Sequence, residues 1–437
     1  MPGSGVSAAA VDAPGAAVAR GTHPYYVLAL LFLAYTFSFV DRQILSILFE
    51  PIKAEMELSD TQLGFLGGLA FALFYSTLGV PIAMLADRSV RTRIITVSLV
   101  VFSAMTALCG LAQNFWHLAL ARVGVGVGEA GVNPASHSII ADIFPPAKRS
   151  TAMGLIAVGP NAGMLIGLAA GGILSVQYGW RVTIMAVGLP GLLLALIFWL
   201  TVREPRRGGS ESRSADVAAP PVRESVVYMW RNRAMRHLVI GAMMKGIGGY
   251  GLVSWMPSFL IRTHDLSAAQ VGLLLGVGLG VIGGLGAFLG GYLNDRLSKR
   301  RAGAGLAVIA VITAAVYPFS VGAYLVPELW LCAALLVFQI FGGGMYLAPS
   351  FALVQSLARL RMRSVAAAVK MLAINLIGLG LGPWAVGALS DMLRPAFGDD
   401  SLRIAMPIVG AFAVWGALHF YLSSRHLEEG LAEAQRD

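Results

Sequence analysis

The sequence predicts an all-α membrane protein of twelve transmembrane helices, arranged as two related six-helix bundles. Three observations predict this fold: the composition is strongly apolar, twelve apolar stretches can each cross a bilayer, and one charged motif occurs once in each half. Of the 437 residues, 57 % are hydrophobic and only 13 % are charged. Soluble domains carry about 25 % charged residues, so this composition indicates a chain surrounded mostly by lipid.

The apolar stretches have the length that a membrane helix needs. A bilayer core of about 30 Å is crossed by about 20 helical residues. Several stretches contain Gly or Pro, which membrane helices tolerate better than soluble ones. We predict transmembrane helices near residues 26–49, 62–85, 94–112, 115–138, 151–175, 182–200, 237–261, 270–293, 304–325, 329–356, 365–390 and 404–423.

One long polar interruption, residues 201–236, divides these helices into six and six. No small-residue cleavage site follows the first apolar run, so we interpret that run as a retained helix and not as a signal peptide. The predicted organisation is a disordered cytoplasmic tail (1–25), a six-helix bundle (26–200), a cytoplasmic linker (201–236), a second six-helix bundle (237–424) and a cytoplasmic tail (425–437).

The distribution of basic residues predicts the orientation in the membrane. If both termini lie on one side, most of the 32 lysines and arginines fall in the tails and loops of that side. The loops of the other side hold five, namely Lys53, Arg181, Arg262, Arg394 and Arg403. By the positive-inside rule, both termini are cytoplasmic in a bacterial inner membrane. The net charge of +9 then reflects topology and attraction to anionic lipid headgroups, and no nucleic-acid partner is expected.

An internal repeat supports two related halves. The second predicted helix ends in Leu85-Ala-Asp87-Arg88, and the eighth ends in Leu293-Asn-Asp295-Arg296. Both copies place Leu-x-Asp-Arg at a cytoplasmic helix end, with further basic residues close behind. Duplicated halves related by an axis along the membrane normal are known among secondary transporters.

These motifs resemble those of the major facilitator superfamily. The first copy of the repeat resembles the superfamily's loop 2–3 signature, although Ala83 and Val90 replace two glycines. The fourth predicted helix carries Arg122-x-x-x-Gly126-x-Gly128, and the fifth carries a Gly159-Pro160 motif common among antiporters. The resemblance implies the superfamily's fold and transport by alternating access.

A narrower resemblance is to the Spinster family. It lies in Phe39-Val-Asp41-Arg42 and in the run from Arg122 to Pro146, which contains Gly128-Glu129-Ala130. Spinster proteins are linked to proton-coupled export of lysolipids and sphingosine 1-phosphate. The resemblance therefore implies a proton-coupled exporter of lysophospholipid- or sphingolipid-like amphiphiles, which uses the proton gradient and no cofactor.

Four charged residues fall deep inside the predicted helices of the first half. A charge at mid-helix costs about 2.5–3.5 kcal/mol on insertion scales, so such residues are expected to be functional. Asp41 and Arg122 lie at similar depth, roughly 10–12 Å from the periplasmic side at 1.5 Å per residue. Glu129 lies deeper, with no evident basic partner. We predict that Asp41 and Glu129 bind protons and that Arg122 contacts both a carboxylate and the substrate's anionic head. A static ion pair between helices 1 and 4 is the alternative.

Further polar residues are candidates for substrate contact. They are Arg42, Lys245, Tyr250, Gln339, Lys370 and Asn375. The two lysines lie within reach of the cytoplasmic ends, so snorkelling is an alternative role for them. A polyol would require many buried hydrogen-bonding groups, and the second half offers few. A charged half that faces an apolar half better fits an amphiphile with an anionic or zwitterionic head.

Residues at the cytoplasmic helix ends are expected to latch the two halves together in one state of the transport cycle. These latch candidates are Asp87, Arg88, Asp142, Arg149 and Asp295, and Gly159 and Pro160 within the fifth predicted helix are further gating or structural candidates. His137 and His419 are expected to be packed helix residues and not proton carriers.

Other classes of function find little support in the sequence. The glycine-rich stretches 276–291 and 341–344 lie inside apolar helices, where close helix packing explains them better than nucleotide binding. Cys109 and Cys332 offer no disulfide framework or metal site, and there is no His-x-x-x-His cluster or appended soluble domain. We therefore expect a monomeric transporter and not an enzyme. An organic-anion/proton symporter and a broad-specificity drug exporter are the alternatives.

Overall fold

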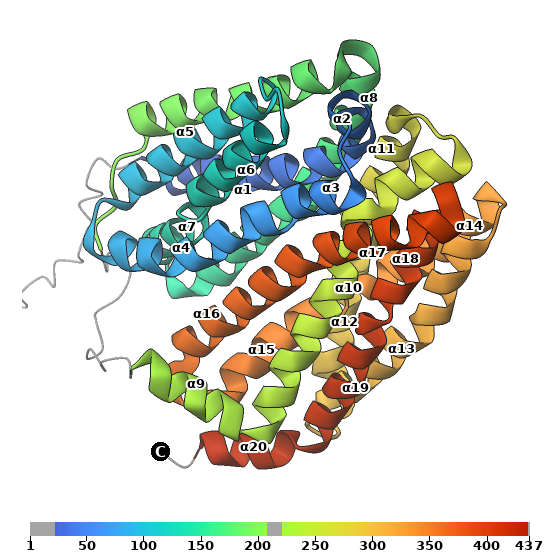
Figure 1. Cartoon of the computed structure of the whole chain (residues 1–437). Coiled ribbons are helices and arrows are strands. Elements are labelled where there is room, and N and C mark those ends of the chain that lie inside the picture. Colours follow the sequence, from blue (N-terminus) through green and yellow to red (C-terminus); the bar gives the residue numbers. More distant parts are fainter. Residues whose placement is uncertain (1–21, 208–220, 436–437) are drawn as a thin grey trace, which may run out of the picture.

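The computed structural model describes residues 22–207 and 221–435, which fold into helices with no strand among them. The predicted disorder of the first residues and the centre of the predicted linker lie outside the described residues. Figure 1 shows the first half in blue to green and the second in yellow-green to red, packed side by side.

The first half holds eight helical segments. They are α1 (Pro24–Ile47), α2 (Phe49–Met56), α3 (Asp60–Gly67), α4 (Leu69–Arg88), α5 (Arg91–Cys109), α6 (Phe115–Glu129), α7 (Val132–Ile143) and α8 (Pro146–Thr201). The second predicted crossing is α3 plus α4, and the fourth is α6 plus α7. Crossings five and six run together in α8 and turn at Gly179, whose φ of 76° is a conformation that glycine adopts readily.

The second half is more interrupted. It comprises α9 (Val222–Arg231), α10 (Arg233–His264), α11 (Ala268–Val277), η1 (Gly278–Ile282), α12 (Gly283–Ser298), α13 (Ala304–Leu325), α14 (Leu329–Gly343), α15 (Leu347–Leu357), η2 (Leu360–Met362), α16 (Arg363–Ala373), η3 (Ile374–Leu381), α17 (Gly382–Phe397), η4 (Gly398–Asp400), α18 (Ser401–Gly410), α19 (Phe412–Arg425) and α20 (Leu427–Ala434). The sequence analysis missed α9, which lies inside the predicted linker. Segments η1 and η3 are π-helical, a form that often marks functional sites.

The described helices account for twelve crossings. Nine helical stretches between residues 22 and 435, outside the gap at 208–220, are long and apolar enough to span a membrane. Two of them, Pro146–Thr201 with 56 residues and Leu360–Arg425 with 66, are long enough to cross twice. The remaining crossing is Phe115–Ile143. The protein is thus a multi-pass membrane protein, and the predicted twelve-helix fold is confirmed.

The two halves are joined mainly at one end, here called the contact end, which holds residues 48–61, 262–268 and 391–401. The opposite, terminal end holds residues 88–91, 201–207 and 425–435. At the contact end α8 and α11 pack backbone to backbone: a Cβ added at Gly172 or Gly272 would lie 2.2 Å from a backbone oxygen of the other helix. In Figure 1 the halves meet near α3, α11 and α17 and diverge toward α4 and α9.

The buried apolar side chains follow the same division. One cluster contains residues of both halves, including Phe49 and Trp255, whose ring centroids lie 5.1 Å apart. A second cluster belongs to the first half except for Leu379, and a third belongs wholly to the second half. The halves therefore share a core at the contact end and keep separate cores toward the terminal end.

Candidate functional site

The membrane interior of the first half contains a group of buried charges on α1 and α6. Asp41, Arg122 and Glu129 are only 3 %, 3 % and 2 % exposed. Glycines carry α6 close to its neighbours: a Cβ at Gly126 would lie 2.5 Å from the backbone oxygen of Phe71. Close packing of α6 against α4 thus holds these charges away from water.

Glu129 is paired with Arg42. Its Oε2 lies 2.8 Å from Nε and 2.7 Å from Nη2 of the guanidinium. The expectation that Glu129 lacks a basic partner was wrong, because counting along one helix did not show that Arg42 of α1 reaches it. The other carboxylate oxygen, Oε1, is buried and has no hydrogen-bond partner among the described residues. Glu129 therefore keeps a free acceptor that a proton or a ligand could use.

Three aromatic rings surround the Arg42 guanidinium. Its Cζ lies 4.8 Å from the ring centroid of Phe39, 4.8 Å from that of Phe71 and 4.5 Å from that of Tyr75. Aromatic rings around a carboxylate-paired cation form the kind of cage that recognises organic cations. Here the protein's own guanidinium fills the cage.

Asp41 and Arg122 are not paired in this conformation, although their similar depth suggested that they could meet. Asp41 Oδ2 accepts a hydrogen bond of 2.9 Å from Thr106 Oγ1. Arg122 Nε donates to the Leu66 carbonyl at 3.3 Å, and its Cζ lies 5.3 Å from the Phe71 ring. No ion pair joins Arg122 to a carboxylate among the described residues. A permanent cation is therefore buried with its charge uncompensated by a direct partner, which is costly unless an anion joins it.

Lys370 is the most buried charge of the second half. It is 0 % exposed, its Nζ donates to Ser350 Oγ at 2.8 Å, and Nζ lies 3.4 Å from the centre of the Phe351 ring. The snorkelling alternative is therefore wrong for Lys370. Lys245 on α10 is half-buried, beside Gly416 of α19.

The other predicted substrate contacts are dispersed. Tyr250 packs against the separate cores of both halves, so it lies between them. Gln339 accepts a hydrogen bond from Ser320 and donates one to Tyr324, at 2.6 and 2.7 Å, within the second half. Asn375 is 6 % exposed and lies in the π-helical segment η3.

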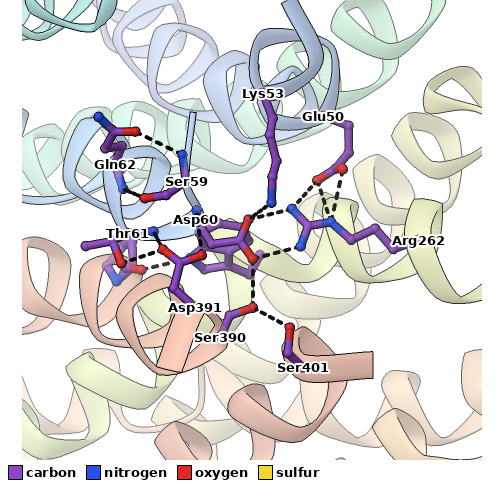
Figure 2. Close-up of polar contacts among 12 residues, drawn as sticks. Glu50, Lys53, Ser59, Asp60, Thr61, Gln62, Arg262, Ser390, Asp391 and Ser401 are labelled. Carbon is purple, nitrogen blue, oxygen red and sulfur yellow. Dashed lines mark hydrogen bonds and ion pairs between the residues drawn. The ribbon is translucent and has the colours of Figure 1, made fainter. Parts of the chain in front are cut away.

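The contact end carries an ionic network that the sequence analysis did not predict (Figure 2). Arg262 of the second half donates to both oxygens of Asp60, each at 2.8 Å, and its Nε lies 3.0 Å from both oxygens of Glu50. Lys53 also pairs with Asp60, and Ser390 Oγ donates to Asp60 Oδ2 at 2.7 Å. Asp60 is only 2 % exposed. The network joins the halves through a bidentate, largely buried ion pair, which is stronger than an exposed one.

A signal for this network was present in the distribution of charge. Only a few basic residues were predicted on the side of the membrane that holds the contact end, and most of them make ion pairs or hydrogen bonds in the structure. Arg181 pairs with Glu55 at 2.8 Å, and Arg403 donates to the carbonyl of Leu325 at 2.6 Å.

The structure gives contacts for two of the charged gating candidates. Asp142 pairs with Arg91, and Arg149 donates to the Ala141 carbonyl, both within the first half. Arg88 and Asp295 are exposed, and the side chain of Asp87 lies outside the described part of the structure. Gly159 lies beside Thr36 of α1, and Pro160 follows it inside α8. A latch at the terminal end remains a prediction for another state.

Comparison with known proteins establishes the class. The chain matches the family model of the Major Facilitator Superfamily over residues 31–383. It therefore belongs to this superfamily, whose members are transporters and not enzymes. An MFS-type efflux pump of Mycolicibacterium smegmatis is 33 % identical over 98 % of this chain and 99 % of its own length.

Two further comparisons narrow the type. Protein spinster homolog 3 of Danio rerio is 24 % identical over 94 % of this chain and 87 % of its own. A bacterial homologue of the human lysosomal transporter Spinster, in an inward-facing and unoccupied conformation, has a TM-score of 0.85 and 31 % identity, covering 93 % of this chain and 98 % of that one. The resemblance seen in helices 1 and 4 is thus confirmed: the chain is a Spinster-type transporter.

Proposed function

We propose that the protein is a proton-coupled secondary transporter that exports lysophospholipid- or sphingolipid-like amphiphiles by alternating access. It lies in a bacterial inner membrane with both termini in the cytoplasm. In this orientation the contact end is periplasmic, and the described conformation is closed to the periplasm.

The observation that carries the substrate proposal is the state of Arg122. Its buried guanidinium has a backbone carbonyl as hydrogen-bond partner and no carboxylate partner within residues 22–207 and 221–435. A guanidinium binds phosphate through two parallel hydrogen bonds. An incoming phosphate or carboxylate head would supply the missing charge, and apolar helices nearby would accept an acyl chain.

The proton proposal rests on Asp41 and Glu129. Asp41 has a hydroxyl partner in Thr106, and Glu129 shares one oxygen with Arg42 and leaves the other without a partner. Export driven by the inward proton gradient requires substrate and proton to compete for the site. The cationic part of a zwitterionic head that pairs with Glu129 would compete with a proton for this carboxylate, while the phosphate of the head pairs with Arg122. Substrate binding would then release the proton, and protonation of Glu129 would release the substrate.

Broad drug export is the second candidate. The efflux pump of M. smegmatis aligns with nearly the whole chain, and the ring cage around Arg42 is suited to organic cations. In this variant an amphiphilic cation would displace Arg42 from Phe39, Phe71 and Tyr75 and pair with Glu129.

Transport by purified protein in liposomes tests both candidates. An imposed pH gradient should drive movement of lysophosphatidylglycerol and lysophosphatidylcholine, and collapse of the gradient with an ionophore should stop it. Gradient-driven movement of ethidium without lysolipid transport would replace the lysolipid proposal with drug export. Movement of dicarboxylates alone would support an organic-anion symporter.

Orientation has a separate test. A single cysteine at residue 210, between the halves, should resist impermeant thiol reagents in intact cells and react after lysis. Labelling from outside would overturn the proposed orientation without touching the substrate proposal.

A further inference from the structure

One carboxylate of the second half caps a helix of the first. The first backbone N–H groups of a helix have no partner within that helix. In α3, Ser59 and Gln62 form a capping box, which satisfies the N–H of Gln62 and that of Ser59 itself. The N–H groups of Asp60 and Thr61 point instead to Asp391, which lies on α17 (Figure 2).

The contacts of Asp391 use both of its carboxylate oxygens. Oδ1 accepts from the Asp60 N–H at 3.1 Å, and Oδ2 accepts from the Thr61 N–H at 2.7 Å and from Thr61 Oγ1 at 2.6 Å. A carboxylate at this position is also favoured by the positive end of the helix dipole. No ion pair of Asp391 is found in the described part of the chain, so this contact is distinct from the Arg262–Asp60 pair beside it.

We propose that Asp391 is a positioning residue of the transport cycle, which holds the contact end closed by capping α3 across the two halves. The inference rests on the proposed alternating access, because only a protein whose contact end opens has to release this cap. On opening, Asp391 leaves with α17, and the N–H groups of Asp60 and Thr61 pass to water. The strength of the cap therefore sets part of the balance between the two conformations.

The test measures conformation directly. Spin labels are placed at Ala54 and Ala396, which are exposed residues of opposite halves at the contact end. The background replaces Cys109 and Cys332, both buried, by alanine. Distances are measured by pulsed electron paramagnetic resonance on the protein in lipid nanodiscs without substrate. Asp391→Ala should lower the ratio of closed to open protein roughly fivefold, the usual effect of losing a helix cap.

Two variants and one control separate this effect from damage to the fold. Asp391→Asn should give a smaller shift, and Thr61→Val, which removes the hydroxyl and keeps the N–H, a smaller one still. Asp399→Ala is the matched control, since Asp399 is an exposed acid close by that makes no hydrogen bond or ion pair to the first half among the described residues. It should leave the distances unchanged, and each variant must elute as a single folded species.

The outcomes distinguish this inference from the proposed function. Wild-type distances in both Asp391→Ala and Thr61→Val would overturn the capping role, whatever is transported. Equal shifts in Asp391→Ala and Asp399→Ala would also overturn it, since a general loss of negative charge would then explain them. Failure of the wild-type protein to move lysolipids would remove the proposed substrate and leave the distance measurements valid.

Discussion

The two halves bury their charges in different ways. In the first half two arginines and two carboxylates lie together, and Arg42 and Glu129 compensate each other within 2.8 Å. In the second half Lys245 and Lys370 lie inside the helices, and no carboxylate lies at mid-span in the part of that half that the structure describes. The partners of Lys370 are instead the hydroxyl of Ser350 and the aromatic ring of Phe351.

This difference indicates a division of labour. The first half can exchange partners among its own charges, as a proton-coupled switch requires. The second half offers Lys370 only a hydroxyl and an aromatic ring among the described residues, so an anion that pairs with it must come from elsewhere. Arg122 combines both properties, because it lies in the charged half and has no carboxylate partner among the described residues.

The largest expected effect comes from removing Arg122. Arg122→Ala should reduce binding of phosphate-headed lipids about tenfold to a hundredfold, the usual value of a hydrogen bond to a charged group. Arg122→Lys should recover only part, because an ammonium lacks the guanidinium's fork. Scintillation proximity binding with radiolabelled lysolipid measures this. If the double variant Asp41→Asn/Arg122→Ala recovered binding and proton-driven uptake, a static ion pair would be the correct interpretation.

The two carboxylates should differ in what their loss does. Glu129→Gln removes the ionic partner of Arg42, whereas Asp41→Asn leaves the Thr106 hydroxyl able to donate to the amide oxygen. We expect both variants to lose proton-driven transport and to reach the membrane folded, with the greater loss of thermal stability in Glu129→Gln. Proton flux in liposomes and thermal unfolding in detergent test this pair. Normal proton coupling in either variant would remove that residue from the proton-binding pair.

Replacing Lys370 tests the second half. Burial of a charge without a counter-ion is costly, and an apolar side chain of similar volume does not carry this cost. Lys370→Met should therefore keep or raise the unfolding temperature while it weakens binding of anionic lipids several-fold. Lys245→Met, at a half-buried position, is the comparison variant. A marked fall in unfolding temperature for Lys370→Met would show that its contacts to Ser350 and Phe351 are mainly structural.

Local sequence features predicted the fold because each helix carries its own signal. The length of the apolar stretches predicted the twelve crossings. Lipid offers no hydrogen-bonding partners to backbone N–H and C=O groups, so each apolar stretch has to satisfy them as a helix. The interruptions within the helices were harder to predict, because the break at Gly68 and the π-helical segment around Asn375 depend on packing between helices. Segment α9 was missed because its ten residues are too few to cross a bilayer and lie in a polar stretch.

The sequence predicted which charged residues make up the candidate site, but not which of them pair with one another. Burial of a charge is costly enough that Asp41, Arg42, Arg122 and Glu129 stood out in the sequence. Their partners depend on side-chain direction, so Arg42 and not Arg122 reaches Glu129. The Asp60–Arg262 pair was missed because both residues lie near helix ends, where a charge needs no special reason.

The smallest expected effect lies at the terminal end, where basic residues that follow the repeated motif have different partners in the two halves. Arg91 of the first half is 1 % exposed and pairs with Glu204 at 2.7 Å. Partial burial raises the pKa of Glu204, but hydrogen bonds from Thr92 and Arg91 outweigh it and hold the pKa below its usual value. In the second half Arg301 and Glu428 form a pair of 3.8 Å between exposed side chains.

At the terminal end, these contacts predict that Glu204 of the first half contributes to the free energy of unfolding in a pH-dependent way, and that Glu428 of the second half does not. A carboxylate whose pKa is lower in the folded protein stabilises it above the unfolded pKa of about 4.3, and this stabilisation is lost as the pH falls through the folded value. Glu204→Gln should therefore cost about 1 kcal/mol at pH 7, and the difference from wild type should shrink in acid. Glu428→Gln, the matched control, should change little at either pH because its ion pair is exposed. Thermal unfolding in detergent between pH 7 and pH 3.5 provides the measurement. A Glu204→Gln difference that stays constant with pH would mean that the side chain acts there by packing and not by its charge.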